Sequence, residues 1–242
     1  MNLAGRSIVV CRAPHQASPL LDALRAVGAT PIHVPLLTVE PPLDGGRALR
    51  RALMACDGSA WLAVTSGNGV DAVAAAVDAG VALPTRIAVV GAATAARAAA
   101  HGWVVDHVSP EASADSLGRT LPAGPGERVV AAVAELASDD LARALADRGI
   151  EVTVVTAYRT VIPDVSGADL DRVVAADVIV VTSPSIIDRL IDLVGEADLP
   201  ALVAIGGTTA SAVVRHGRAV AAVADEPTID GLIDAVVRTL DP

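Results

Sequence analysis

Aromatic side chains are nearly absent from this chain of 242 residues. They make up 1% of it, with two Trp, one Tyr and no Phe, whereas hydrophobic residues make up 52%. Proteins that bind single strands of nucleic acid stack the bases on aromatic rings, so the composition argues against that class. The apolar residues are mostly Ala and Val, which favours helices packed on sheets by small side chains over an aromatic-rich β-sandwich.

Basic runs, cysteine motifs and long apolar runs are missing as well. The net charge is −10 and no stretch of Lys or Arg interrupts it, which further excludes nucleic acid as a partner. Cys11 and Cys56 have no metal or redox spacing, and we expect both to be small buried hydrophobes. No apolar run approaches the roughly 18 residues of a membrane span, and the N-terminus does not read as a signal peptide. We therefore expect a cytoplasmic protein with no metal site at its cysteines and no membrane partner.

Short runs rich in Val and Ile alternate with helical segments along the whole chain, which is typical of parallel α/β sheets. The expected strands cover residues 7–11, 31–34, 60–64, 87–90, 103–107, 128–132, 152–156, 178–181, 202–205 and 219–223. The expected helices cover residues 17–27, 68–79, 93–101, 113–121, 138–147, 184–194, 208–216 and 228–240. Ten strands of this kind predict two five-stranded sheets.

The chain is internally duplicated. A strand followed by Thr65-Ser66 recurs as a strand followed by Thr182-Ser183, and Gly91 with Thr94 recurs as Gly206 with Thr209. Residues 6–34 likewise resemble residues 128–155. Every strand end that could carry chemistry therefore occurs twice, and two such ends facing each other would form a cleft.

The linkers predict which segments share a sheet. The turn at 122–126 is short, as is usual within an α/β unit, so the segments on both sides of it should lie in one domain. The other two joins are long and carry prolines, as domain boundaries do. We therefore predict one domain from 38–162 and a discontinuous one from 1–37 with 163–242. The crossings near 35–42 and 157–163 should run side by side.

Six motifs in this order resemble the uroporphyrinogen-III synthase family. They are Val9-Val10-Cys11-Arg12-Ala13-Pro14, Thr65-Ser66-Gly67-Asn68-Gly69-Val70, Val90-Gly91-Ala92-Ala93-Thr94-Ala95, Ala157-Tyr158-Arg159-Thr160, Thr182-Ser183-Pro184-Ser185 and Ile205-Gly206-Gly207-Thr208-Thr209-Ala210. The resemblance implies two flavodoxin-like parallel-sheet α/β domains joined by a two-stranded ladder. It also implies a lyase that cyclises hydroxymethylbilane, a linear tetrapyrrole, to uroporphyrinogen III with inversion of ring D and loss of water. The reaction uses no metal and no cofactor. We expect a monomer, and a weak contact with the preceding enzyme of the pathway stays open.

The resemblance assigns roles to particular residues. Tyr158 would be catalytic, donating a hydrogen bond to the departing hydroxyl of ring A. The residues expected to bind the substrate's carboxylates are Arg12, Thr65, Ser66, Asn68, Gly69, Thr94, Thr160, Ser183, Ser185, Thr208 and Thr209. Hydroxyls and backbone N–H groups at helix starts can bind carboxylates with few cations. The alternatives stay open: the Ser and Thr residues could be helix caps, Tyr158 could pack between domains, and Arg12 could form a surface ion pair.

One segment departs from the family pattern, and one other class of protein competes. After the strand at 128–132, similar proteins usually carry a basic loop containing glycine, whereas residues 133–138 read Val-Ala-Glu-Leu-Ala-Ser, and Glu135 would repel carboxylates. The competing class is a two-lobed protein that binds a small molecule without catalysis. A nucleotide-binding protein is a weaker alternative, because the chain has neither Gly-x-Gly-x-x-Gly nor a P-loop.

Overall fold

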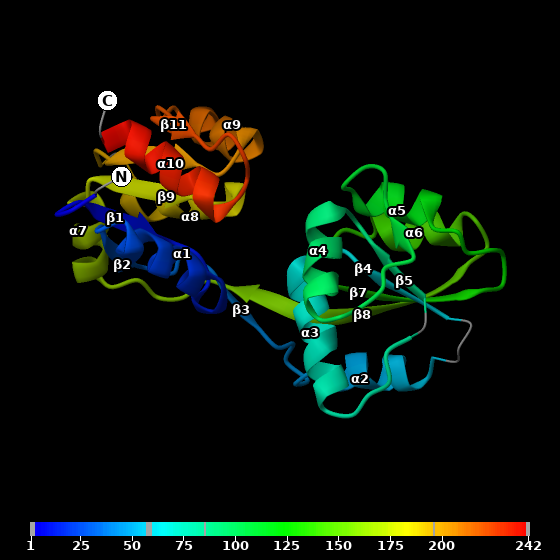
Figure 1. Cartoon of the computed structure of the whole chain (residues 1–242). Helices are drawn as coiled ribbons and strands as arrows, with labels where there is room; N and C mark the ends of the chain where they lie inside the picture. The colour runs from blue at the N-terminus through cyan, green and yellow to red at the C-terminus, as the bar shows by residue number, and fades with distance from the viewer. Residues whose placement is uncertain (1–2, 57–59, 85, 196, 241–242) are drawn as a thin grey trace. The chain divides into compact units, whose positions relative to one another are not determined.

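The computed structural model describes residues 3–56, 60–84, 86–195 and 197–240 (Figure 1). By its internal contacts the chain divides into two compact units. Unit 1 comprises Met1–Thr38 with Val161–Pro242, and unit 2 comprises Val39–Thr160. Each unit is built on one twisted sheet of mainly parallel strands, which confirms the predicted α/β class.

Unit 1 contains a five-stranded sheet in the order β11-β10-β9-β1-β2. Its elements are β1 (Ser7–Val10), α1 (Pro14–Ala26), β2 (Thr30–His33), α7 (Gly167–Val174), β9 (Val178–Val181), α8 (Pro184–Val194), β10 (Ala201–Ala204), α9 (Gly207–Arg215), β11 (Ala222–Val223) and α10 (Ile229–Leu240). This is the strand order of flavodoxin-like sheets. Its first two strands come from one end of the sequence and the other three from the far end.

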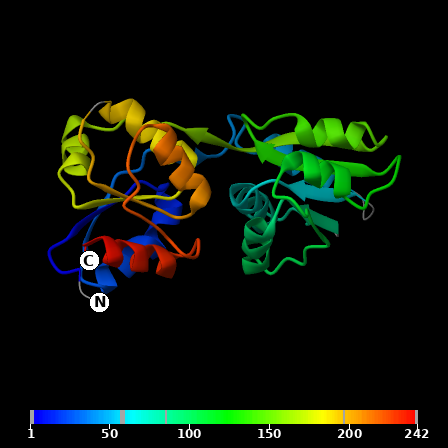
Figure 2. The ribbon, with the colours of Figure 1, turned by 90° about the horizontal axis from the view of Figure 1, so that it is seen from above.

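Helices cover both faces of the unit 1 sheet. Ile8 and Val10 point to the face covered by α1 and α10, whereas Val9 points to the face covered by α7, α8 and α9. Figure 2 shows this layering, with the blue α1 and red α10 on one side of the sheet and the yellow-orange α8 and α9 on the other. Because both faces are buried, the strands read as continuous Val and Ile runs.

A cluster of polar contacts ties together the two distant parts of unit 1. The Asp177 carboxylate, just before β9, accepts hydrogen bonds from the backbone N–H of Ser7 at 2.8 Å and from its hydroxyl at 2.7 Å. Arg6 forms an ion pair with the same carboxylate at 3.1 Å. The start of β1 is thus fixed beside the start of β9.

Unit 2 contains a six-stranded sheet in the order β3-β8-β7-β4-β5-β6. Its elements are β3 (Thr38–Glu40), α2 (Arg47–Met54), β4 (Trp61–Val64), α3 (Gly67–Asp78), β5 (Arg86–Val89), α4 (Ala92–Ala100), β6 (His107–Val108), α5 (Ala114–Thr120), β7 (Arg128–Ala134), α6 (Asp140–Ala146) and β8 (Glu151–Val161). Without β3, the spatial order repeats that of unit 1. Strands β7 and β8 take the places of β1 and β2, and β4, β5 and β6 take the places of β9, β10 and β11.

The duplication extends to contacts between helices. In unit 2 the Asp71 carboxylate on α3 lies 3.0 Å from Nε2 of His101, which ends α4. In unit 1 the Asp188 carboxylate on α8 lies 2.7 Å from Nε2 of His216, which ends α9. The same helix pair is therefore joined in the same way in both units.

Three elements were not among those expected from the sequence, and several strands differ in extent. Helices α2 and α7 and strand β3 all lie in the stretches interpreted as linkers. Strand β3 adds a sixth strand to one sheet, so the expectation of two five-stranded sheets was wrong. Strands β6 and β11 are shorter than expected, because each is a two-residue edge strand, and β8 is longer because it continues past the end of β7 to Val161, with β3 as its neighbour.

Candidate functional site

The predicted residues Ser66 and Tyr158 meet in unit 2. Ser66 follows β4 and is the N-cap of α3, and its Oγ accepts a hydrogen bond from the Gly69 N–H at 3.1 Å. The same hydroxyl donates to the Tyr158 hydroxyl oxygen at 3.0 Å. Because Ser66 donates its proton, the proton of Tyr158 is available for another acceptor. Two residues that lie far apart in the sequence thus form one pair of hydroxyls.

An irregularity in β8 turns the Tyr158 side chain to this face. Val133 on β7 pairs with Thr156, but the next residue, Ala134, pairs with Tyr158, so Ala157 is an extra residue on β8. A bulge of this kind re-aims the side chain that follows it. As a result the consecutive residues Ala157 and Tyr158 both contact the core cluster beneath α2 and α3. Regular alternation would have sent them to opposite faces.

Gly69 has a structural role at this site. A Cβ atom at position 69 would lie 2.9 Å from Cγ1 of Val64 and 3.3 Å from the carbonyl oxygen of Ala132. The first turn of α3 therefore lies directly against β4 and β7. The Gly69 N–H is already bonded to Ser66, so it is not available to a ligand in this arrangement.

Arg12 and Ser183 occupy the matching place in unit 1. Val10 pairs with Val180, and Arg12 and Thr182 each lie two residues beyond that pair, at the carboxyl ends of β1 and β9. In flavodoxin-like sheets ligands bind where neighbouring strands lead to opposite faces, and β1 and β9 are those strands here. Arg12 and Ser183 are both half-buried at this edge.

The Arg12 guanidinium has no ion-pair partner within the described part of the chain. Burial lowers its pKa below the ordinary arginine value. A partly buried cation without a partner is costly, and a bound anion would offset that cost. The alternative that Arg12 forms a surface ion pair is therefore not seen with any of the described residues.

The helix-capping alternative holds for one serine and not for the other. Ser66 caps α3 with its side chain, whereas Ser183 precedes Pro184 and makes no side-chain cap on α8. The Ser183 hydroxyl instead lies 3.0 Å from the hydroxyl of the exposed Ser185. In unit 1 these two hydroxyls are therefore free of a capping role.

The remaining predicted residues differ in how far solvent reaches them. Thr94 on α4 is 5% exposed and Thr209 on α9 is 3% exposed, and the N-caps of these helices are Gly91 and Gly206. The partly or fully exposed ones are Thr65, Asn68, Thr160 and Thr208. Thr208 is thus the accessible hydroxyl at the start of α9, whereas Thr94 and Thr209 contact their neighbours in the core.

The loop after β7 is acidic in the structure, as its sequence indicates. A hollow of about 180 Å³ lies there between β7, β8 and α6, and its lining includes Glu135, Ser138 and Asp139 but no basic residue of the described chain. The Glu135 N–H donates to the Tyr158 carbonyl at 2.9 Å, which fixes this loop beside β8. This edge of unit 2 therefore offers carboxylates where unit 1 offers Arg12.

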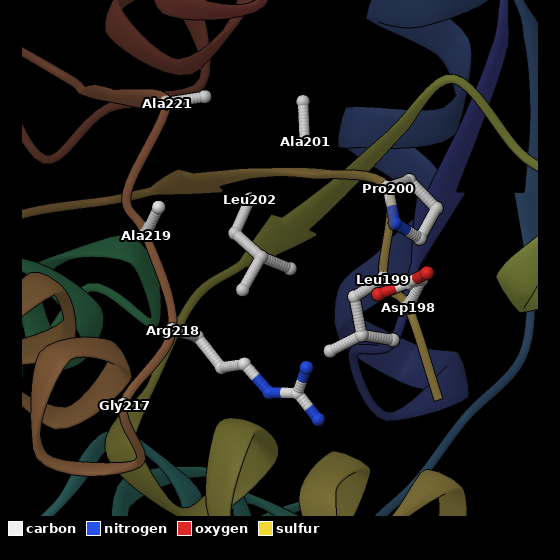
Figure 3. A pocket seen from close by; sticks show the side chains of 9 residues that line it. All are labelled: Asp198, Leu199, Pro200, Ala201, Leu202, Gly217, Arg218, Ala219 and Ala221. Atoms are coloured by element: carbon white, nitrogen blue, oxygen red, sulfur yellow. The ribbon is translucent and has the colours of Figure 1, made fainter. Parts of the chain in front are cut away.

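A second hollow lies in unit 1, at the edge of the sheet opposite the one where Arg12 and Ser183 lie. It has a volume of about 340 Å³ and is lined by residues before β10 and after α9 (Figure 3). The Arg218 side chain borders it and donates to the Gly195 carbonyl at 2.6 Å, while Asp198 lies on its other side. Because it lies at the amino ends of the strands, it is separate from the predicted site.

Three arginines that sequence analysis did not single out lie on α2. Arg47, Arg50 and Arg51 are spaced so that one face of a helix presents all three. The Arg-x-x-Arg-Arg spacing was a usable signal, but the surrounding prolines and glycines led us to interpret the segment as a linker.

The described residues contain neither a candidate metal site nor a helix that could span a membrane. No group of three His, Cys, Asp or Glu side chains there could hold a metal ion. No helix there is both long and apolar enough to cross a membrane. Cys11 is fully buried, and burial raises the pKa of its thiol to about 12, in keeping with a core hydrophobe. Cys56 is only partly buried, so the expectation of a fully buried thiol was wrong there.

Together these features define a two-unit α/β protein with duplicated flavodoxin-like sheets and polar strand ends. The sequence matches the family model for uroporphyrinogen-III synthase HemD over residues 18–234. The chain therefore belongs to the uroporphyrinogen-III synthase family.

Related sequences and solved structures agree with this family. A uroporphyrinogen-III synthase of Synechococcus elongatus is 35% identical over 167 residues, which is 66% of this chain and 63% of that protein. The porphyrin biosynthesis protein HemD of Ruminiclostridium josui is 29% identical over 98% of this chain and 49% of its own length. The chain thus spans between about half and two thirds of the length of these curated relatives.

Two solved structures share the fold. A mutant uroporphyrinogen III synthase of Thermus thermophilus matches with a TM-score of 0.64 at 21% identity, covering 98% of this chain and 99% of that one. The Helicobacter pylori uroporphyrinogen-III synthetase matches with a TM-score of 0.62 at 15% identity, covering 96% and 99%. At such identities the likeness concerns the fold.

Proposed function

We propose that this chain is a uroporphyrinogen-III synthase that cyclises hydroxymethylbilane to uroporphyrinogen III, inverting ring D and releasing water. Family membership supports the reaction class. The observation that carries the proposal at the level of residues is the hydrogen bond between Ser66 and Tyr158, because it leaves the phenol proton free beside the carboxyl ends of β4 and β7. Enzymes of the family work without a metal or a cofactor, and we propose none here.

Tyr158 is the proton donor in this proposal. The bond between the hydroxymethyl carbon of ring A and its oxygen breaks, and the electron pair leaves with the oxygen, which takes the Tyr158 proton and departs as water. Loss of the ring A pyrrole N–H proton then gives a neutral azafulvene. The Ser66 hydroxyl bonds to the phenol oxygen at 3.0 Å and so stabilises the negative charge that develops there.

The later steps need orientation more than acid catalysis. Ring D attacks the azafulvene carbon through its substituted position to give a spiro intermediate. The bond between that ring D carbon and the bridge carbon of ring C then breaks, which leaves an azafulvene at ring C. The other α carbon of ring D attacks this bridge carbon and loses its proton to solvent, so ring D is inverted. Holding both ends of one flexible substrate together can supply a large part of the rate enhancement. We propose that polar strand ends bind the substrate's carboxylates.

In unit 1 the proposed carboxylate ligands are Arg12, Ser183, Ser185 and Thr208. The partly buried Arg12 guanidinium, which has no ion-pair partner among the described residues, gives a charge-assisted contact, and the three hydroxyls give weaker ones. Burial of Thr94 and Thr209 favours a supporting role for these two. In unit 2 the proposed carboxylate ligands are Thr65, Asn68 and Thr160, whereas Ser66, whose hydroxyl is bonded to Tyr158, acts through that residue.

The domain limits, the location and the oligomeric state are part of the same proposal. We propose domains of 1–37 with 163–242 and of 38–162, and a cytoplasmic monomer. Light scattering of the purified protein tests the monomer, and a dimer at micromolar concentration would contradict it. The two-lobed binding protein without catalysis has no observation in its favour.

The consumption of hydroxymethylbilane by the purified chain tests the proposed activity. We expect the linear substrate to disappear faster than in buffer alone, in proportion to the concentration of protein. Binding of the tetrapyrrole without faster consumption would instead indicate a binding protein.

A further inference from the structure

Helix α2 carries a cluster of positive charge that no carboxylate of the described chain neutralises. Leu49 and Leu53 are each 2% exposed and anchor one side of the helix in the core of unit 2. Arg47 and Arg51 are exposed and Arg50 is half-buried. Among the described residues none of the three forms an ion pair; Arg47 donates to the Asp44 carbonyl at 3.1 Å and Arg50 to the Gly45 carbonyl at 2.9 Å.

The nearest carboxylate is used for another purpose. The Asp44 side chain accepts from the N–H groups of Gly46 at 2.8 Å and Ala48 at 2.6 Å, so it satisfies the free N–H groups at the start of α2. These hydrogen bonds hold the pKa of Asp44 below its ordinary value. Arg47 also contributes to this lowering, but Asp44 is committed to the helix start by its hydrogen bonds and forms no ion pair with any of the three arginines.

This arrangement is costly, because like charges three or four residues apart on a helix destabilise it. Several exposed arginines on other helices are instead paired with an acid one turn away, as Arg25 is with Asp22, Arg119 with Asp115 and Arg172 with Asp169. In a chain of net charge −10, an unpaired basic cluster indicates an anionic ligand.

The start of α2 lies on the side of unit 2 that carries Tyr158. The segment that enters α2 is held to β8 by Arg159, which contacts the Glu40 carboxylate at 2.5 Å and the Pro41 carbonyl at 3.3 Å. From its last residue α2 leads to the start of β4, so its first turn lies toward the carboxyl ends of the strands (Figure 1). Leu49 and Leu53 share one core cluster with Ala157 and Tyr158.

We propose that Arg47, Arg50 and Arg51 bind carboxylates of the tetrapyrrole at the Tyr158 end. The inference rests on the proposed function and names a binding surface for that substrate. Guanidinium groups pair with carboxylates through two parallel hydrogen bonds, and the substrate carries eight carboxylates. Because the loop after β7 is acidic, α2 supplies the positive charge that this loop lacks in unit 2.

The test compares two triple variants of equal charge change. The first is Arg47→Gln, Arg50→Gln and Arg51→Gln, which keeps good helix formers on α2. The control is Arg25→Gln, Arg119→Gln and Arg172→Gln, which removes three exposed arginines from other helices. Thermal unfolding of both variants checks that they fold. A third variant, Arg47→Lys, Arg50→Lys and Arg51→Lys (the Lys triple), keeps the charge.

For the α2 variant we expect the KM for hydroxymethylbilane to rise about 10-fold, as three exposed charge contacts allow, with kcat within about twofold. The rise of KM with added NaCl should flatten, because fewer ion pairs remain to be screened. The control should match the parent, and the Lys triple should lie between. An unchanged KM in the α2 variant, or an equal rise in the control, would overturn the inference.

A binding measurement separates this inference from the proposed activity. Uroporphyrin III, a stable octacarboxylate, is titrated into each protein and its fluorescence anisotropy is followed. Weaker binding by the α2 variant alone supports the inference even if the parent does not turn over hydroxymethylbilane. If the α2 variant binds uroporphyrin III as the parent does but loses binding to anionic vesicles or duplex DNA, the surface belongs to another ligand and the inference is wrong.

Discussion

Removal of the Ser66 hydroxyl tests whether Ser66 acts on the reaction through Tyr158. The hydroxyl makes two bonds, one that caps α3 at Gly69 and one to the Tyr158 oxygen. Ser66→Gly loses both, but a glycine N-cap costs only a few tenths of a kcal/mol in helix stability, whereas Ser66→Ala costs about 1 kcal/mol. The two variants therefore separate helix stability from the hydrogen bond to Tyr158.

The expected size of the effect follows from the geometry. A net hydrogen bond of about 0.5–1.5 kcal/mol to the Tyr158 oxygen corresponds to a loss of about 2–12-fold in kcat for Ser66→Gly. Tyr158→Phe removes the proton donor itself and should lose about 10–100-fold. Because Ser66 would act only through the Tyr158 hydroxyl, Ser66→Gly should have no further effect on kcat when it is combined with Tyr158→Phe.

The assay measures kcat and KM for hydroxymethylbilane consumption by the parent, both single variants and the double variant. Urea unfolding supplies the stability of each, with Ser66→Ala as the control for the cap. We expect Ser66→Ala to match Ser66→Gly in kcat and to be less stable. If Ser66→Gly slows the Tyr158→Phe variant by the same factor as it slows the parent, Ser66 contacts the substrate directly and the reasoning is refuted.

Three further predictions concern the binding residues, the joining of unit 1 and the domain limits. Thr208→Ala should weaken binding of uroporphyrin III by about 1 kcal/mol, whereas the buried Thr209→Ala should chiefly lower stability; stronger loss of binding in Thr209→Ala would reverse the assignment. The N–H and hydroxyl of Ser7 hold the pKa of Asp177 below its ordinary value, so its stabilisation is present above the unfolded-state pKa of about 3.9 and is lost as the pH falls through the folded-state value. Asp177→Asn should therefore make the free energy of unfolding fall less steeply as the pH is lowered. If the fall is as steep as in the parent, a group other than Asp177 causes it. The segment 38–162, expressed alone, should unfold cooperatively in urea. A segment without a cooperative unfolding transition would contradict the proposed domain limits.

Much of the fold could be predicted because its signals are local. Buried strands read as Val and Ile runs, and Gly28, Gly102, Gly149 and Gly217 mark helix ends with positive φ angles of 69–86°. The missed elements lack such signals. Strand β3 has three residues and exists because β8 continues beside it, and α2 is stabilised by the burial of Leu49 and Leu53.

The sequence predicts which residues form the site, but it does not predict how their side chains contact one another. Periodicity gives the strand end at Ser66 and the motif gives Tyr158, but their hydrogen bond depends on the extra residue Ala157 in β8. A single insertion in a ladder is set by pairing across the sheet and leaves no mark in the local pattern. The unpaired state of Arg12 likewise depends on which carboxylates the fold brings near it, which no spacing in the sequence specifies.

The isomer composition of the product tests the central claim most directly. Hydroxymethylbilane closes on its own to the type I isomer, whereas the proposed enzyme inverts ring D and forms type III. With the purified chain present at increasing concentration, chromatography of the oxidised products should show type III replacing type I, and Tyr158→Phe should shift the mixture back toward type I. Type I alone, at every concentration of folded parent protein, would contradict the account.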